Sequence, residues 1–166
     1  MNPVTPQPAS LDSVAEQLRA AFPDAELSFV DPGVPAILLP AEELVAVCEY
    51  LKATPGLAFD YLASVTAIDY LDRIDLVYQL RSLADRRDLI LRVELERDAS
   101  VAPSVVGVWR AADFQEREIY DLMGVRFTGH PNLKRILLYD EFDGHPLRKD
   151  WRLPAEPRTI PPAPSL

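Results

Sequence analysis

The chain has few of the residues that build redox and metal sites. Among its 166 residues there are one cysteine and two histidines. A disulfide takes two cysteines, and zinc or iron–sulfur sites take several thiolates or imidazoles. No Gly-rich phosphate-binding loop is visible either. We therefore expect no metal or cofactor-binding residue in this chain. We expect Cys48 to be a small buried hydrophobe on the apolar face of a helix.

Long apolar runs are also missing. No stretch of the sequence approaches the roughly 20 apolar residues that a membrane-spanning helix needs. The first residues carry neither the basic charges nor the apolar core of a signal peptide. We expect a protein that is cytosolic or is bound to a membrane only through partners.

Basic residues are scarce in the first 100 residues, where 8 Lys and Arg stand against 17 Asp and Glu, whereas residues 101–166 hold 9 of each kind. A nucleic-acid-binding surface needs a basic face, so we expect no nucleic-acid partner. In the neutral part, the basic residues gather at Lys134-Arg135 and Arg148-Lys149. This favours an acidic protein partner or another anionic contact there.

Proline is abundant, with 16 residues, and half of them form clusters near the two ends. Such clusters are typical of extended, non-helical segments. We predict an extended or disordered arm at residues 1–9, one domain at residues 10–139 and an extended docking tail at residues 140–166. The terminal prolines are Pro3, Pro6, Pro8, Pro154, Pro157, Pro161, Pro162 and Pro164.

The domain's pattern predicts an α+β fold. Ser10 is a candidate N-cap for a helix that ends at Pro23, and Cys48 lies on the inner face of a second helix at residues 41–54. Strands are expected at 26–30 and 34–39, around a turn at 31–33, and residues 57–70 are mixed in period. Alternating apolar residues at 74–80 and 89–95 predict an antiparallel hairpin with a polar turn at 84–88. The expected architecture is an antiparallel or mixed sheet covered by two helices, then a further helix and the Pro-rich tail.

The signature region, residues 116–151, differs most from ordinary core-and-surface patterning. Asp113 is a candidate N-cap with Glu116 three residues later, and Gly124 can end the helix in the left-handed conformation. Arg117 and Asp121 are four residues apart, so their side chains can meet on the helix surface. The simplest interpretation is a solvated charged helix face with capped ends, above an inner face of Ile119, Leu122 and Met123.

Two catalytic interpretations of this region stay open beside the simple one. Glu116, Glu118, Asp121 and His130 could form a carboxylate–imidazole metal site, or Glu118 could be a general acid or base in a stand-alone hydrolase with His130. Di-iron bundles take Glu-x-x-His motifs from two helices, and the chain offers only one Glu-x-x-Asp. We therefore expect no catalytic residue.

The triplets Gly129-His130-Pro131 and Gly144-His145-Pro146 favour rigid loops, because a residue before proline is extended and an imidazole can bond the backbone. We expect a docking surface here, where Arg135, Arg148 and Lys149 meet carboxylates of a partner. We expect Trp151 to anchor an interface, because Trp and Arg are enriched in interfaces. Trp109 more simply closes the core. The expected interface residues are Glu116, Arg117, Glu118, Asp121, Gly124, His130, Pro131, Arg135, Gly144, His145, Pro146, Leu147, Arg148, Lys149, Asp150 and Trp151.

The signature region resembles the 30 kDa subunit family of NADH:quinone oxidoreductase, respiratory complex I. Weaker similarity covers residues 57–69. The matching residues are Glu116-Arg117-Glu118, Asp121, Gly124, Phe127, Gly129-His130-Pro131, Leu133, Arg135-Ile136-Leu137 and Gly144-His145-Pro146-Leu147-Arg148-Lys149-Asp150.

The resemblance implies the same α+β fold and a non-catalytic structural subunit of the peripheral arm. That arm passes electrons from NADH through FMN and iron–sulfur centres, held in other subunits, to quinone, coupled to proton translocation. The implied partners are the quinone-site subunit and the subunit with the terminal iron–sulfur cluster, on the cytoplasmic side of the bacterial inner membrane. Because Leu166 follows the signature closely, we expect a separate polypeptide rather than a fusion. The alternative is the equivalent subunit of a membrane-bound hydrogenase or a ferredoxin-dependent chloroplast-type complex.

Overall fold

The centre of the fold is a long hairpin. The computed structural model describes residues 11–30 and 36–153. β4 (Arg73–Ser82) pairs with β5 (Arg87–Glu96), and the register sets Ile74 opposite Leu95 and Tyr78 opposite Leu91. The predicted hairpin is confirmed. Its turn is residues 83–86, shorter than expected, because Arg87 and the residue after it extend the ladder.

Three further strands complete a mixed sheet. β1 (Ser28–Val30) and β2 (Ala36–Leu38) form a short antiparallel pair, and β3 (Tyr61–Asp69) pairs with β4. The order is β1-β2-β5-β4-β3, with β2 parallel to β5. Residues 57–70 looked mixed in period because β3 begins late and has a bulge between Leu62 and Ser64. β3 is therefore an edge strand.

Two N-terminal helices pack on this sheet as predicted. α1 (Leu11–Ala21) buries Val14 and Leu18, and α2 (Leu44–Ala53), which follows the 3-10 helix η1 (Ala41–Glu43), buries Cys48. Phe22 meets Tyr50 edge to face, which joins the end of α1 to α2. The Ser10 cap, the turn at 31–33, the arm at 1–9 and the tail beyond 153 lie outside the described residues.

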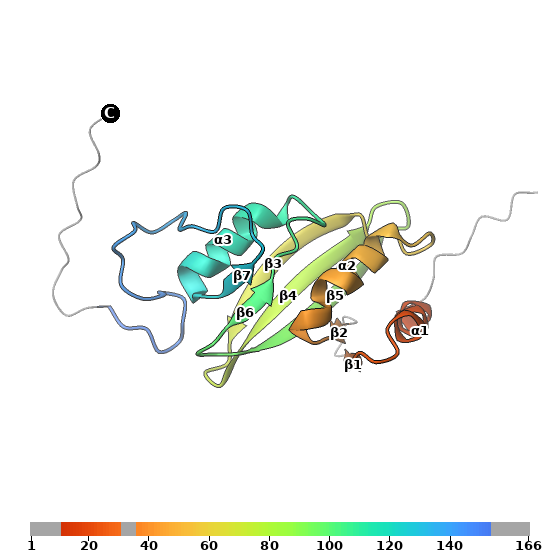
Figure 1. The fold of residues 1–166 in the computed structure, drawn as a ribbon, viewed down its shortest axis with the longest axis horizontal. Coiled ribbons are helices and arrows are strands. Elements are labelled where there is room, and N and C mark those ends of the chain that lie inside the picture. The colour runs from red at the N-terminus through yellow and green to blue at the C-terminus, as the bar shows by residue number, and fades with distance from the viewer. Residues whose placement is uncertain (1–10, 31–35, 154–166) are drawn as a thin grey trace, which may run out of the picture.

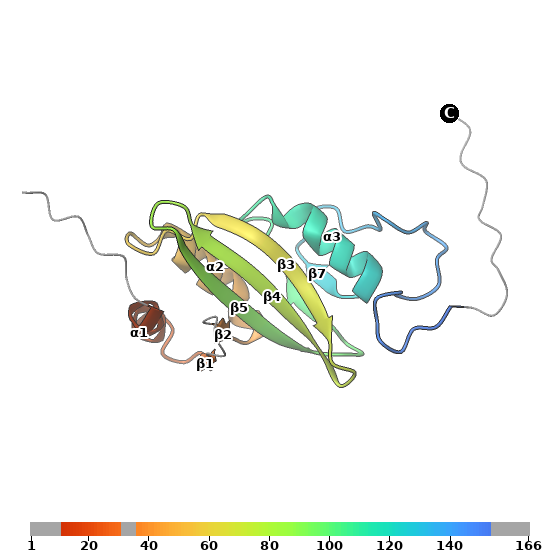
Figure 2. The ribbon, with the colours of Figure 1, turned by 180° about the vertical axis from the view of Figure 1, so that it is seen from behind.

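A β-α-β unit carries the signature region. β6 (Val101–Pro103) runs parallel to β7 (Arg126–Thr128), and α3 (Ala112–Met123) connects them and packs against β3. α2 lies on one face of the large sheet, α3 lies along the outer edge of β3, and the other face of the sheet carries no helix among the described residues (Figure 1, Figure 2). Trp109, 4% exposed, closes the core as expected. The described helices include none long and apolar enough to cross a membrane.

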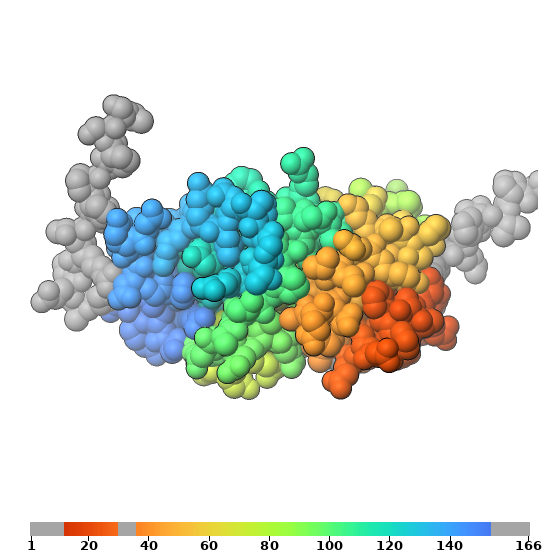
Figure 3. Space-filling model, in the orientation of Figure 1, coloured from red at the N-terminus to blue at the C-terminus, as the bar shows by residue number. Residues whose placement is uncertain are grey.

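The C-terminal segment, residues 129–153, does not leave the body of the protein. It packs around the end of α3 and covers one end of the molecule, opposite the end that α1 and α2 form (Figure 3). The docking tail expected from residue 140 is therefore bonded within the chain up to residue 153. Hydrogen bonds to buried carboxylates hold this segment in place.

Candidate functional site

Glu116 joins α3 to the loop before it. Its side chain is fully buried; one oxygen accepts a bond from the Val105 N–H at 2.8 Å and the other from the Ser104 hydroxyl at 2.6 Å. Burial raises the pKa of Glu116, although these two bonds work in the opposite direction. The predicted cap at Asp113 is wrong, since the N-cap is Ala111 and has no side-chain bond. The capping box fails with it, because Glu116 bonds residues outside the helix.

Asp121 holds the loop that follows β7. One carboxylate oxygen accepts three consecutive backbone N–H groups, and the other accepts the Arg135 guanidinium at 2.9 Å. Burial alone would raise the pKa of Asp121, but these donors outweigh it and lower the pKa. The donors are Ile136 at 3.0 Å, Leu137 at 2.8 Å and Leu138 at 2.9 Å.

The predicted Arg117–Asp121 pair and the solvated charged helix face are both wrong. Arg117 donates instead to the carbonyls of Lys134 and Arg135, both at 3.2 Å. Glu116, Arg117 and Asp121 are all buried. Helical spacing alone made the charges look like surface pairs, whereas a segment that packs over α3 supplies their real partners.

Both histidines bond the backbone, as the loop interpretation predicted. His130 accepts the Asn132 N–H on Nδ1 at 3.0 Å, so its Nε2 carries the proton and donates to the Asp113 carbonyl at 3.2 Å. His145 donates from Nδ1 to the Asp121 carbonyl at 2.9 Å. Each ring therefore ties a Gly-His-Pro loop to α3.

Gly124 ends α3 in the left-handed conformation, with φ of 75°, as predicted. A Cβ at this position would lie 2.5 Å from the His145 ring. Arg148 then donates from Nε to the Met123 carbonyl at 2.8 Å, so a cation satisfies the helix C-terminus. The expectation that Arg135 and Arg148 are free to meet a partner's carboxylates is wrong, because both guanidiniums are bonded within the chain.

Asp69 anchors the end of the C-terminal segment. It accepts Arg97 through two bonds, at 2.9 and 3.0 Å, and the Lys149 N–H at 2.8 Å. The Arg97 bonds, followed by backbone N–H groups, lower the pKa of Asp69 despite its burial. Arg97 also reaches Asp150 at 2.5 Å. Sequence reasoning missed Asp69 and Arg97 as parts of this region. The one signal in the sequence was Asp69 itself, a carboxylate at the end of an apolar strand.

The end of the C-terminal segment forms its own small cluster. Trp151 stacks on Phe142, with ring centroids 5.8 Å apart, and donates to the Asp143 carbonyl at 3.3 Å. Trp151, which was expected to anchor an interface, therefore packs within its own chain. Gly144 gives it room, because a Cβ there would lie 2.9 Å from the indole.

The two catalytic interpretations do not fit this geometry. The described residues contain no group of three His, Cys, Asp or Glu side chains placed to hold a metal. Both ring nitrogens of His130 are bonded to backbone. Glu118 is exposed and borders a groove between α3 and β3. Neither a carboxylate–imidazole site nor a Glu118–His130 acid–base pair is formed.

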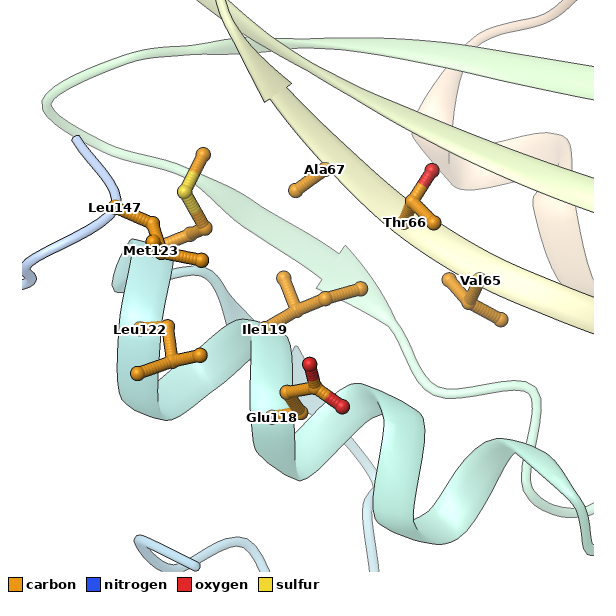
Figure 4. A pocket seen from close by; sticks show the side chains of 8 residues that line it. All are labelled: Val65, Thr66, Ala67, Glu118, Ile119, Leu122, Met123 and Leu147. Atoms are coloured by element: carbon orange, nitrogen blue, oxygen red, sulfur yellow. The ribbon is translucent and has the colours of Figure 1, made fainter. Parts of the chain in front are cut away.

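An exposed group of signature residues remains. Leu147 is 59% exposed and donates its N–H to the Leu122 carbonyl at 3.1 Å. Lys149 is exposed, with Nζ 5.7 Å from the Tyr70 ring centroid. Glu118 and Leu147 border a groove of about 190 Å³ between α3 and β3 (Figure 4). The signature region therefore has buried side chains that are hydrogen-bonded within the chain and a small exposed surface of apolar and charged side chains.

Comparison with known proteins places the chain in a family. A model described as respiratory-chain NADH dehydrogenase, 30 Kd subunit, matches residues 37–157. The C subunit of NADH-quinone oxidoreductase from Moorella thermoacetica is 46% identical over 149 residues, which cover 88% of this chain and 98% of the relative. The same subunit from a Roseiflexus species is 40% identical and covers 87% of this chain and 85% of the relative.

Two solved structures share the fold. The trypsin-resistant fragment (1-134) of Nqo5 superposes with a TM-score of 0.63 at 32% identity, over 74% of this chain and 98% of the fragment. A chain of the archaeal membrane-bound sulfane sulfur reductase superposes with a TM-score of 0.71 at 23% identity, over 86% of this chain and 85% of that one. The family match covers β3, β4 and β5 of the mixed sheet together with α2, α3 and the C-terminal segment. The chain therefore belongs to the family of the 30 kDa subunit of respiratory-chain NADH dehydrogenase.

Proposed function

We propose that the chain is a non-catalytic structural subunit of the peripheral arm of NADH:quinone oxidoreductase. The observation that carries the proposal is the family match over residues 37–157, which includes most of the described fold. Several signature side chains point inward and bond their own chain, which supports the proposal that the subunit is non-catalytic. A group that performs acid–base chemistry must reach substrate, whereas Glu116, Asp121 and His130 are bonded to their own chain.

The cofactors of the reaction belong, in this proposal, to other subunits. Electrons pass from NADH through FMN and iron–sulfur centres to quinone, and this chain supports the arm beside the quinone-site subunit and the terminal iron–sulfur subunit. It lies on the cytoplasmic side of the bacterial inner membrane, held there by those partners. The exposed Leu147 and Lys149, fixed in place by Asp69 and the end of α3, suit such a contact.

A deletion and add-back experiment tests the proposal. Membranes from cells that lack the chain should lose NADH-dependent quinone reduction, and expression of the wild-type chain should restore it. Purified chain should show no NADH oxidation by itself. Full quinone reduction in membranes without the chain would contradict the proposal.

The equivalent subunit of a membrane-bound hydrogenase or ferredoxin-dependent complex is a second candidate. The fold shared with a chain of the membrane-bound sulfane sulfur reductase favours keeping it, although at 23% identity the likeness concerns fold alone. The electron donor separates the two. Quinone reduction that depends on this chain and is driven by NADH supports the first proposal, and dependence on hydrogen or reduced ferredoxin supports the second.

A further inference from the structure

The two Gly-His-Pro loops use the Nδ1 atoms of their histidines in opposite ways. Nδ1 of His130 accepts the Asn132 N–H at 3.0 Å, so this atom carries no proton. Nδ1 of His145 lies 2.9 Å from the Asp121 carbonyl, which can only accept, so this atom carries a proton. An imidazolium has N–H groups on both ring nitrogens and accepts no hydrogen bond. Protonation of the ring is therefore incompatible with the bond to Asn132 and compatible with the bond to Asp121.

A charged His130 ring has a carboxylate to pair with. The ring is fully buried, and its Nε2 lies 3.4 Å from Oδ1 of Asp113 as well as 3.2 Å from the carbonyl of the same residue. Within residues 11–30 and 36–153, this buried Oδ1 accepts no hydrogen bond. Burial raises the pKa of Glu116, and His130 is one of the groups that oppose the rise, so a second carboxylate lies near the ring. Lys134, on the chain beyond the loop, is exposed. The protonated ring can therefore stay in place as an ion pair with Asp113.

The loop that contains His130 is held at both ends. The ring of His130 fixes its start on α3. Beyond the loop, Leu133 packs against the core, and the Lys134 carbonyl is bonded to a side chain of α3. Between these points Pro131 and Asn132 are exposed, and the hydrogen bond from the Asn132 N–H to the ring closes this stretch. Loss of that bond would free two residues and leave the rest of the segment attached.

We infer that His130 is a pH-sensitive latch on the loop of residues 129–133. The neutral ring closes the loop through the Asn132 N–H. When Nδ1 takes up a proton from solvent, that hydrogen bond breaks and the ring pairs with the Asp113 carboxylate through Nε2. Pro131 and Asn132 are then released. The loop of His145 does not respond in this way, because its Nδ1 already donates.

The loop therefore has two hydrogen-bonded states that differ by one proton. In the neutral state the ring bonds both Asn132 and the Asp113 carbonyl, and in the charged state its contacts with Asp113 become ionic while the Asn132 N–H turns to water. Imidazole is the side chain whose charge ordinarily changes between about pH 5 and 8. This behaviour does not depend on which complex contains the chain. A partner contact through Pro131 and Asn132 would lose its fixed geometry in acid, and that consequence rests on the proposed function.

Nuclear magnetic resonance of the isotope-labelled full chain, titrated from about pH 8 to about pH 5, tests the latch. The ring protons of His130 report protonation. The protection of the Asn132 amide against hydrogen exchange, corrected for the intrinsic effect of pH, reports the bond. We expect that protection to fall about tenfold as the ring becomes charged, the factor that one hydrogen bond supplies. The Leu147 amide, which donates to the Leu122 carbonyl, should stay protected throughout. Constant protection of Asn132 while the ring titrates, or a ring that stays neutral over the whole range, would overturn the inference.

Two variants separate the latch from general loosening in acid. His130→Asn places an amide oxygen near the position of Nδ1, where it can still accept the Asn132 N–H but cannot take up a proton, so protection should no longer depend on pH. Asp113→Asn removes the partner of the charged ring and should move the transition to lower pH. Glu118→Gln, at an exposed position on the same helix, is the matched control and should leave the transition in place. A transition that persists in His130→Asn, or equal midpoints for the two carboxylate variants, would show that His130 and Asp113 do not operate the loop.

Discussion

Substitution of Asp121 by alanine tests the carboxylate that holds the signature region together. The change removes the acceptor for three backbone N–H groups and for Arg135, and leaves those donors in a largely buried place. A hydrogen bond to a charged group contributes about 1.5–3 kcal/mol, and loss of one partner of a buried ion pair costs about 3–5 kcal/mol. These terms overlap, so we expect a loss of about 3–5 kcal/mol in the free energy of unfolding.

Urea unfolding of the isolated chain, followed by circular dichroism, measures this loss. The total stability of a domain is about 5–15 kcal/mol, so a change of this size is easily resolved. Glu118→Ala on the same helix is the matched control, and its exposed side chain should cost less than about 0.5 kcal/mol. If Asp121→Ala unfolds within 1 kcal/mol of wild type, on the order of the error of the method, the role assigned to the buried carboxylate is wrong.

The same residue should show a defined pH dependence. The pKa of Asp121 is lower in the folded chain than in the unfolded one, where it is about 3.9. Its contribution is therefore complete above the unfolded pKa and is lost as the pH falls through the folded pKa. The difference in unfolding free energy between wild type and Asp121→Ala should be constant from pH 6 to 8 and should shrink in acid. A difference that grows in acid would contradict this sign.

Four further outcomes are expected. Gly124→Ala should lower stability by at least about 1–2 kcal/mol in urea unfolding, because its φ is positive and the His145 ring fills the space; an unchanged midpoint would refute this. Arg148→Ala should cost about 1–2 kcal/mol and Lys149→Ala less than about 0.5, since only the first side chain bonds the end of α3; equal effects would show otherwise. Wild type should lose stability as the pH rises through the raised pKa of Glu116, and Glu116→Gln should remove this loss. Urea midpoints from pH 4 to 8 measure both. Elemental analysis and absorption spectra of the isolated chain should show no stoichiometric metal, flavin or iron–sulfur cluster.

The sequence predicted the parts of the fold that depend on local pattern. The alternation in β4 and β5 set their pairing, and the inward position of Cys48 followed from helical spacing. The left-handed end at Gly124 followed from its residue type. Strand order could not be predicted, because the parallel pairing of β2 with β5 joins segments that no short-range pattern connects.

The interior of the signature region was the part that sequence reasoning misjudged. Charged residues on a helix are usually solvated, so Glu116 and Asp121 looked like surface groups. Their partners come from loops on either side of α3, and Asp69 meets the Lys149 N–H from a strand 80 residues earlier. Contacts of that range depend on the folded path of the chain. Residue types alone could name the histidines as loop-holding groups, but could not say which carbonyls they bond.

Recovery of the native assembly tests the central claim most directly. The chain, tagged at one end, is purified from membranes in mild detergent, and the proteins that accompany it are identified and quantified by mass spectrometry. We predict equimolar recovery of the quinone-site subunit and the terminal iron–sulfur subunit, together with NADH-dependent quinone reduction by the eluate. Recovery of the chain alone, or with hydrogenase subunits and no response to NADH, would contradict the proposed function.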